Sequence, residues 1–185
     1  AIGGGLVHLR GWRQDDLPAL YHAATSPGQG RRWRFRGATP SFREFASEFG
    51  HGTLATLVVA SNDDDRVVGS VAAYSASLEN GWTYIGFQGV ADRSGVGLML
   101  EGMFCFVTWL FDTWDLRKVY AELDPGLHDR LVSLGAGLLR VEGRLERHTY
   151  QQGAWQDVLL TAIWRDEWAT FVASVGDLVG LRQPS

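Results

Sequence analysis

The residues that decide the fold run from Tyr84 to Phe111 and read YIGFQGVADRSGVGLMLEGMFCFVTWLF. The first part belongs to a segment over 82–90 whose aromatic and branched residues are typical of a strand. Glycines then gather over 91–97, and an apolar run follows to Phe111. That run contains Glu101 and is too short to span a bilayer comfortably, so it predicts a helix buried inside a soluble protein.

Helices and strands also alternate on the N-terminal side of this segment. Asp15 or Asp16 is suited to cap a first helix, and Ser41 and Glu44 have the spacing of a capping box at the start of a second. The expected elements are a strand over 6–9, the two helices (the second to about 49), and hairpin strands over 54–60 and 66–74.

The C-terminal side ends in a long hairpin. Alternation over 139–148 predicts one face with Leu139, Val141, Gly143 and Leu145, and an opposite face with Arg140, Glu142, Arg144 and Glu146. The expected elements are a strand over 118–123, a short helix from about Leu127, the hairpin strand over 139–148 with its partner over 158–164, and a last helix over about 167–175. The element order is that of a mixed α+β domain with one central sheet.

Composition narrows the class of protein. The 185 residues fit one domain over 1–185, with a core over about 6–168. An apolar share of 45% excludes a disordered chain. A net charge of −4 disfavours a nucleic-acid binder and a polybasic membrane-surface protein. The 8 Trp and 23 Gly predict an aromatic core or lined cavity, together with tight turns or backbone that lies close to a ligand.

A few residue types indicate the cellular compartment and bear on metal binding. The lone Cys105 lies in an apolar run, which indicates a buried, unreactive thiol and favours a reducing, cytoplasmic protein. The first residues lack the charged and apolar regions of a signal peptide. The five histidines are scattered, so no metal site is expected.

Several motifs together resemble the GNAT superfamily of N-acetyltransferases. They are Ile85-Gly86-Phe87, Arg93 to Leu98 with Leu100-Glu101-Gly102, Leu116 to Glu122, Val141 to His148, Trp155 to Val158, and Trp164 to Trp168. The branch that acetylates ribosomal-protein N-termini is the most similar. The resemblance implies a single GNAT-like domain with a central, mostly antiparallel mixed sheet flanked by helices.

The resemblance also implies acetyl-CoA, or another acyl-CoA, as the cofactor. Family members bind its pyrophosphate with backbone N–H groups of a glycine turn at a helix N-terminus. Here the implied cofactor-binding residues are Gln88, Val90, Arg93, Ser94, Gly95, Val96, Gly97 and Leu98. The family pattern places Gln or Arg before the glycines, whereas Asp92 or Ser94 stands there in this chain, and one register puts bulky Met99 at a small position. The other interpretation is that Gly95 and Gly97 only shape a strand-to-helix turn.

The catalytic positions of the family are also altered. An asparagine and a tyrosine that many members carry after the fifth strand correspond to Leu127 and to Leu134 or Gly135. A glutamate on the fourth strand corresponds to Tyr84. The candidate bases are Glu122, His128 and His148. The residues Trp33, Arg34, Phe35 and Arg36 look like a substrate-side loop, and with Tyr84 they are the candidate substrate-binding residues.

The function implied is transfer of an acetyl or other acyl group from acyl-CoA to a primary amine of a small molecule or protein N-terminus. The alternative is a GNAT-fold protein that has lost catalysis and binds a ligand or partner. Family members seat the pantetheine where the fourth and fifth strands splay apart, so fully paired strands there would count against the enzyme. The sequence is compatible with a homodimer, and no membrane partner is expected.

Overall fold

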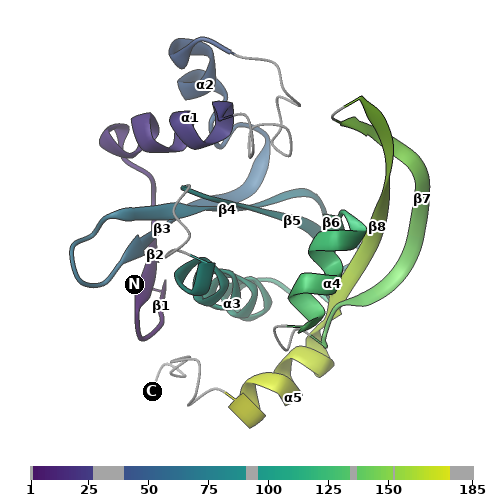
Figure 1. The fold of residues 1–185 in the computed structure, drawn as a ribbon. Helices are drawn as coiled ribbons and strands as arrows, with labels where there is room; N and C mark the ends of the chain where they lie inside the picture. The colour runs from purple at the N-terminus through teal and green to yellow at the C-terminus, as the bar shows by residue number, and fades with distance from the viewer. Residues whose placement is uncertain (1, 27–39, 91–95, 134–136, 152, 176–185) are drawn as a thin grey trace.

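The computed structural model describes residues 2–26, 40–90, 96–133, 137–151 and 153–175. They form an eight-stranded sheet with the order β1-β2-β3-β4-β5-β6-β8-β7 (Figure 1). Strands β5 and β6 run parallel, and the other neighbours run antiparallel. The strands are β1 Ile2–Gly3, β2 Val7–Arg10, β3 Thr53–Ser61, β4 Val67–Ser77, β5 Trp82–Gly89, β6 Lys118–Leu123, β7 Arg140–Gln151 and β8 Ala154–Trp164. The predicted mixed α+β fold is confirmed.

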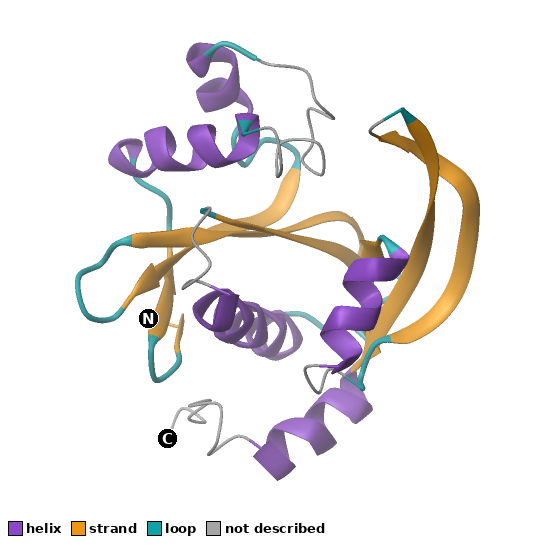
Figure 2. Cartoon of the chain, viewed as in Figure 1, coloured by secondary structure: helices purple, strands orange, loops and turns teal. Residues whose placement is uncertain are grey.

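Helices cover both faces of this sheet (Figure 2). They are α1 Leu17–Thr25, α2 Phe42–Glu48, α3 Val96–Thr113, α4 Pro125–Ser133 and α5 Arg165–Val175, with a 3-10 turn η1 Gln14–Asp16 before α1. Val58 and Ala60 pack with α1 and α2, whereas Val59 between them packs with α3. We call these sides the α1 face and the α3 face.

Helix α3 is the buried helix that the apolar run predicts. Phe106, Val107 and Leu110 are at most 1% exposed, and each contributes about 1.5–3 kcal/mol through burial. Cys105 is also buried, and burial, followed by the charge of Glu101, raises its pKa to about 11. The raised pKa favours the protonated thiol, and the predicted burial of Cys105 is confirmed. Among the described residues, no helix is both long and apolar enough to cross a membrane.

One predicted helix start is confirmed, and two others need correction. Ser41 and Glu44 form the expected capping box, since Glu44 N–H donates to Ser41 Oγ and Ser41 N–H donates to Glu44 Oε2. Asp16, however, makes no side-chain cap to α1. Helix α4 begins at Pro125, earlier than predicted, because proline lacks the N–H that a first turn leaves unpaired and Asp124 Oδ1 accepts the N–H of Leu127.

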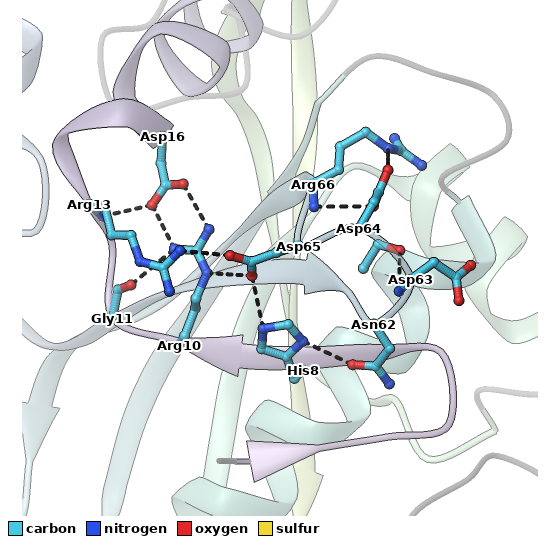
Figure 3. Close-up of polar contacts among 11 residues, drawn as sticks. His8, Arg10, Gly11, Arg13, Asp16, Asn62, Asp63, Asp64, Asp65 and Arg66 are labelled. Carbon is cyan, nitrogen blue, oxygen red and sulfur yellow. Dashed lines mark hydrogen bonds and ion pairs between the residues drawn. The ribbon is translucent and has the colours of Figure 1, made fainter.

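Asp16 instead pairs with Arg10, and Arg10 joins this N-terminal segment to the turn between β3 and β4 (Figure 3). The Arg10 guanidinium donates to both Asp16 oxygens at 2.7 and 2.8 Å and to Asp65 at 3.0 Å. Arg13 donates to Asp65 at 2.6 Å, and His8 Nε2 lies 3.1 Å from the same carboxylate. The Arg10 hydrogen bond lowers the pKa of Asp16, and the bonds from Arg13 and Arg10 lower the pKa of Asp65 to about 2.

The predicted alternation of β7 is wrong beyond its first residues. Arg140 pairs with Ala162 and Leu145 pairs with Val158, so Arg140 and Leu145 share a face of the sheet. The register shifts between Val141 and Gly143, where a bulge inserts one residue and reverses the alternation.

Candidate functional site

Strands β5 and β6 separate after a short paired stretch. Their last matched pair is Tyr84 with Tyr120. Beyond it, the remainder of β5 stays paired with β4, and the remainder of β6 stays paired with β8. The segments 85–89 and 121–123 therefore diverge, and we call this opening the wedge. The splay expected between these strands is confirmed.

The backbone of β5 presents hydrogen-bonding groups to the wedge. The N–H of Val90 donates to the carbonyl of Val68 at 2.8 Å. In an antiparallel pair, successive N–H groups of a strand point alternately toward the partner strand and away from it. The N–H groups of Gly86 and Gln88 consequently face β4, whereas those of Phe87 and Gly89 face the wedge. The N–H of Val90 is thus used inside the sheet and is not free for a cofactor.

The side chain of Gln88 projects from the α1 face. Gln88 lies opposite Ser70, and both side chains are buried. Within the described ranges, Gln88 Nε2 and Ser70 Oγ have no hydrogen-bond partner. If Gln88 binds a ligand, it does so through this unpaired amide rather than through its backbone N–H.

Of the predicted phosphate-binding turn, the structure describes only the residues at the start of α3. Arg93, Ser94 and Gly95 lie outside the described residues, while Val96, Gly97 and Leu98 open α3. A Cβ atom added at Gly97 would meet no heavy atom within 4 Å. The start of α3 therefore combines open space at Gly97 with N–H groups that have no intrahelical acceptor and with the positive end of the helix dipole.

Met99 is accommodated by glycines on the sheet. Met99 is 7% exposed, and a Cβ added at Gly69 would lie 2.6 Å from its Sδ. A Cβ at Gly89 would lie 3.8 Å from its Cγ. The bulky Met99 side chain, which departs from the family pattern, thus points toward the sheet, where Gly69 and Gly89 leave room for it.

Three tyrosines form a row across the strands that border the wedge. Tyr74, Tyr84 and Tyr120 are matched in register on β4, β5 and β6. Ring centroids are 5.8 Å apart for the first pair and 5.3 Å for the second. Tyr74 and Ser70 point to the same face of β4, and Ser70 is paired with Val58, which packs with α1 and α2. The row therefore lies on the α1 face. All three side chains are half-buried.

Glu122 stands at the end of this row. It lies two residues beyond Tyr120 on the same face of β6, and it is exposed. Burial and then the charge of Glu122 raise the pKa of Tyr74 to about 12 and also raise that of Tyr84. In the described part of the chain, no cation pairs with Glu122. The structure therefore brings together two predicted site residues, Glu122 and Tyr84.

The two histidines lie elsewhere. His128 is on α4, which packs on the α3 face through Leu127 and Leu131. Its Nδ1 is 3.3 Å from Asp129, and its buried Nε2 has no hydrogen-bond partner in the part of the chain that the structure describes. His148 is an exposed residue of β7, which β8 separates from β6.

Other predicted positions are only partly described. Leu127, at the family's asparagine position, packs against the core, while Leu134 and Gly135 are outside the described ranges. So are Trp33, Arg34, Phe35 and Arg36. Across the ranges that the structure describes, no three His, Cys, Asp or Glu side chains gather as metal ligands.

Sequence reasoning missed Tyr74, Tyr120 and Trp82. The Trp82 ring lies edge-on to those of Tyr84 and Tyr120, at 5.9 and 6.0 Å. Alternating aromatic positions on three predicted strands were the available signal. Register decides whether such residues meet, and one sequence does not contain it.

Comparison with known proteins gives a consistent picture. A family model described as an acetyltransferase (GNAT) domain matches residues 7–128. No curated protein sequence matches the chain.

Solved structures of acetyltransferases share the fold. A chimera of the spermidine N-acetyltransferase SpeG from Vibrio cholerae and hSSAT is 15% identical, with a TM-score of 0.74 over 88% of this chain and 98% of that chain. A GCN5-related N-acetyltransferase from Brucella melitensis is 20% identical, with a TM-score of 0.74 over 96% and 84%. The Vibrio cholerae spermidine N-acetyltransferase in complex with CoA and spermine is 15% identical, with a TM-score of 0.73 over 88% and 98%.

Proposed function

The chain belongs to the GNAT acetyltransferase family, and on that premise we propose that it transfers an acyl group from acyl-CoA to a primary amine. The wedge is the observation that carries the proposal. Pairing of β5 with β6 ends at Tyr84 and Tyr120, while each strand keeps its other neighbour. An opening of this kind leaves backbone groups that a ligand can bond without breaking the sheet.

The residues around the wedge fit an acyl-CoA. The amides of a pantetheine arm can pair with the free edge of β5 at Gly89, as an added strand would. The first turn of α3 offers N–H groups and open space at Gly97 for phosphate. Bound acyl-CoA supplies the acyl group as an activated thioester. The predicted cofactor-binding residues Arg93, Ser94, Gly95, Val96 and Leu98 complete this proposed site.

Glu122 acts as the general base of the proposed reaction. Its exposed carboxylate accepts a proton from the ammonium form of the acceptor, directly or through a water molecule, and so frees the amine for attack. Tyr74 and Tyr84 border the same position and contact the acceptor. Of the two wedge-facing N–H groups, that of Phe87, which is nearer to Tyr84 along β5, is the donor to an oxyanion, and that of Gly89 is left for the pantetheine arm.

His128 serves the opposite side of the sheet. Glu122 lies on the α1 face, and α4 packs on the α3 face. We assign to Nε2 of His128, which has no hydrogen-bond partner among the described residues, the proton for the departing thiolate, a role that requires this buried atom to become exposed when acyl-CoA binds. In this assignment, the carboxylate and the imidazole handle different protons, and His148 has no role.

The finer assignments stay predictions. They are the branch that acts on ribosomal-protein N-termini, the contribution of Trp33, Arg34, Phe35 and Arg36 to substrate binding, a cytoplasmic location and a homodimer. The alternative of a ligand-binding protein without catalysis is supported by Leu127, an apolar residue at the asparagine position.

Two measurements test the proposal together. Calorimetric titration with acetyl-CoA is expected to give saturable binding, and thiol release is expected to depend on an added primary amine. Absence of binding at millimolar acetyl-CoA would contradict acyl transfer. Binding without thiol release, across small amines and an N-terminal peptide, would favour the alternative.

A further inference from the structure

The ammonium group of Lys118 occupies a binding site that is formed by other side chains of the same protein. Its Nζ donates to both carboxylate oxygens of Glu142 at 2.8 and 3.0 Å. The same atom lies 4.7 Å from the ring centroid of Tyr120 and 4.6 Å from that of Trp164. The Lys118 side chain is only 12% exposed. Two aromatic rings and a carboxylate around one ammonium form the arrangement by which proteins bind cationic ligands.

This ammonium site is continuous with the tyrosine row. Lys118, Tyr120 and Glu122 alternate along one face of β6, and the Tyr120 ring contacts that of Tyr84. Lys118 and Glu122 are four residues apart, so their backbone positions are separated by about 13 Å along the strand. A long, flexible molecule whose amine lies at Glu122 could therefore reach the position of the Lys118 ammonium.

The carboxylate of the ammonium site is already engaged. Glu142 accepts two hydrogen bonds from Lys118 and a third, at 2.9 Å, from the hydroxyl of Tyr120. Among the residues that the structure describes, Glu122 is thus left as the carboxylate beside the tyrosine row that pairs with no cation. A second positive charge on an acceptor would meet the Lys118 ammonium rather than a free anion, and like charges repel.

We propose that Lys118 is a specificity-determining residue that keeps a second cation subsite filled. The protein consequently selects acceptors with a single ammonium group and an apolar body, and it disfavours diamines. This inference rests on the proposed acyl transfer, because that function places the acceptor amine at Glu122.

The test compares octylamine with 1,8-diaminooctane, which differ by one ammonium group. The variants are Lys118→Ala, which empties the subsite, Lys118→Met, which removes the charge but retains the bulk, and Lys118→Arg, which retains a cation. In the wild type and in Lys118→Arg, kcat/KM should be lower for the diamine than for the monoamine. In Lys118→Ala, the ratio of diamine to monoamine should rise by about tenfold, as expected for a desolvated ammonium over aromatic rings. Lys118→Met should show a smaller rise.

An unchanged ratio in a folded and active Lys118→Ala protein would overturn the inference while leaving acyl transfer intact. A wild type that prefers the diamine would overturn it as well. Calorimetric binding of 1,8-diaminooctane without acyl-CoA gives a second readout that does not depend on catalysis. Tighter binding to Lys118→Ala than to Lys118→Met supports the subsite even if no amine is acylated, whereas equal binding counts against it.

Discussion

At the scale of single residues, Glu122 has the surroundings of a working carboxylate. It is exposed at the wedge, and nearby charged groups on β6, β7 and β8 pair with one another instead of with it. Lys118 bonds Glu142, and Arg144 bonds Asp157 at 2.8 Å. A carboxylate that pairs with no cation of the described residues, beside two tyrosines, fits the proposed role of proton acceptor.

Replacement of this carboxylate tests the assignment of the base. Glu122→Gln keeps the size of the side chain but removes its basicity, and general-base catalysis contributes about 100- to 10,000-fold. We expect kcat/KM for acyl transfer to fall by about 100-fold or more, with acetyl-CoA affinity unchanged. Steady-state thiol release measures the first quantity, and calorimetry measures the second. Glu146→Gln on exposed β7 is the matched control, and an equal loss in that variant would contradict the assignment.

Glu101 illustrates a carboxylate with a structural role. It is 7% exposed within α3, and its Oε1 accepts the N–H groups of Leu6 at 2.8 Å and Val7 at 3.3 Å. Helix α3 is thereby tied to the start of β2. The polar residue that interrupts the predicted apolar run is thus explained by two backbone donors from a distant strand.

Its removal should destabilise the fold. Glu101→Ala leaves both N–H groups without an acceptor, and each such loss costs about 1–3 kcal/mol. We expect urea unfolding at neutral pH to show a free energy of unfolding lower by about that amount. Glu101→Gln retains an acceptor oxygen and should lose less. Equal losses in the two variants would mean that the negative charge, rather than the hydrogen bonds, is what matters.

At the scale of elements, the N-terminus of α3 connects the fold to the proposed cofactor. Gly97 is exposed in its first turn, with open space where a side chain would begin. A substitution there changes the charge of the turn without a clash. An acidic side chain also suits a helix N-terminus, so the helix itself is not expected to suffer.

Gly97→Asp should weaken acetyl-CoA binding and leave stability intact. Two like charges 4 Å apart repel by about 1 kcal/mol even in water, so the Kd should rise about fivefold or more. Gly97→Asn has the same shape without the charge and should bind as the wild type does. Calorimetry measures both. If the two variants bind equally well, the phosphates do not lie at this turn.

Local chemistry accounts for which element predictions succeeded. The Ser41–Glu44 capping box and the apolar α3 depend on neighbours in the chain, and both formed as expected. The alternation of β7 failed because a bulge between Val141 and Gly143 reverses the faces. A bulge is set by the partner strand, which the local pattern does not contain.

At the scale of the whole molecule, the Arg10 cluster joins segments that are far apart in the sequence. Asp16 precedes α1, and Asp65 lies in the turn between β3 and β4. Folding lowers the pKa of both carboxyl groups below their ordinary values. Their contribution to stability is therefore complete above the unfolded pKa near 4 and is lost as the pH falls through the lowered folded values.

The acid dependence of stability tests this cluster. The urea midpoint of the wild type should fall between pH 5 and pH 2. Asp16→Asn cannot titrate at this position, so its midpoint should be lower at pH 5 but should fall less over the same interval. Asp63→Asn, in an exposed part of the same turn, is the control. Parallel curves for the wild type and Asp16→Asn would exclude a role of Asp16 in the acid response.

The family resemblance made Glu122 one of three candidate bases, with His128 and His148, but the sequence by itself determined only the class of fold and the buried helix. These follow from periodicity, from local capping and from motifs that lie within one segment. Only the tertiary structure decided that Tyr74, Tyr84 and Tyr120 form one row, that Gly69 makes room for Met99, and that Lys118 occupies the site at Glu142. The physical reason is strand register, because pairing between distant segments fixes which side chains meet, and no local pattern encodes it.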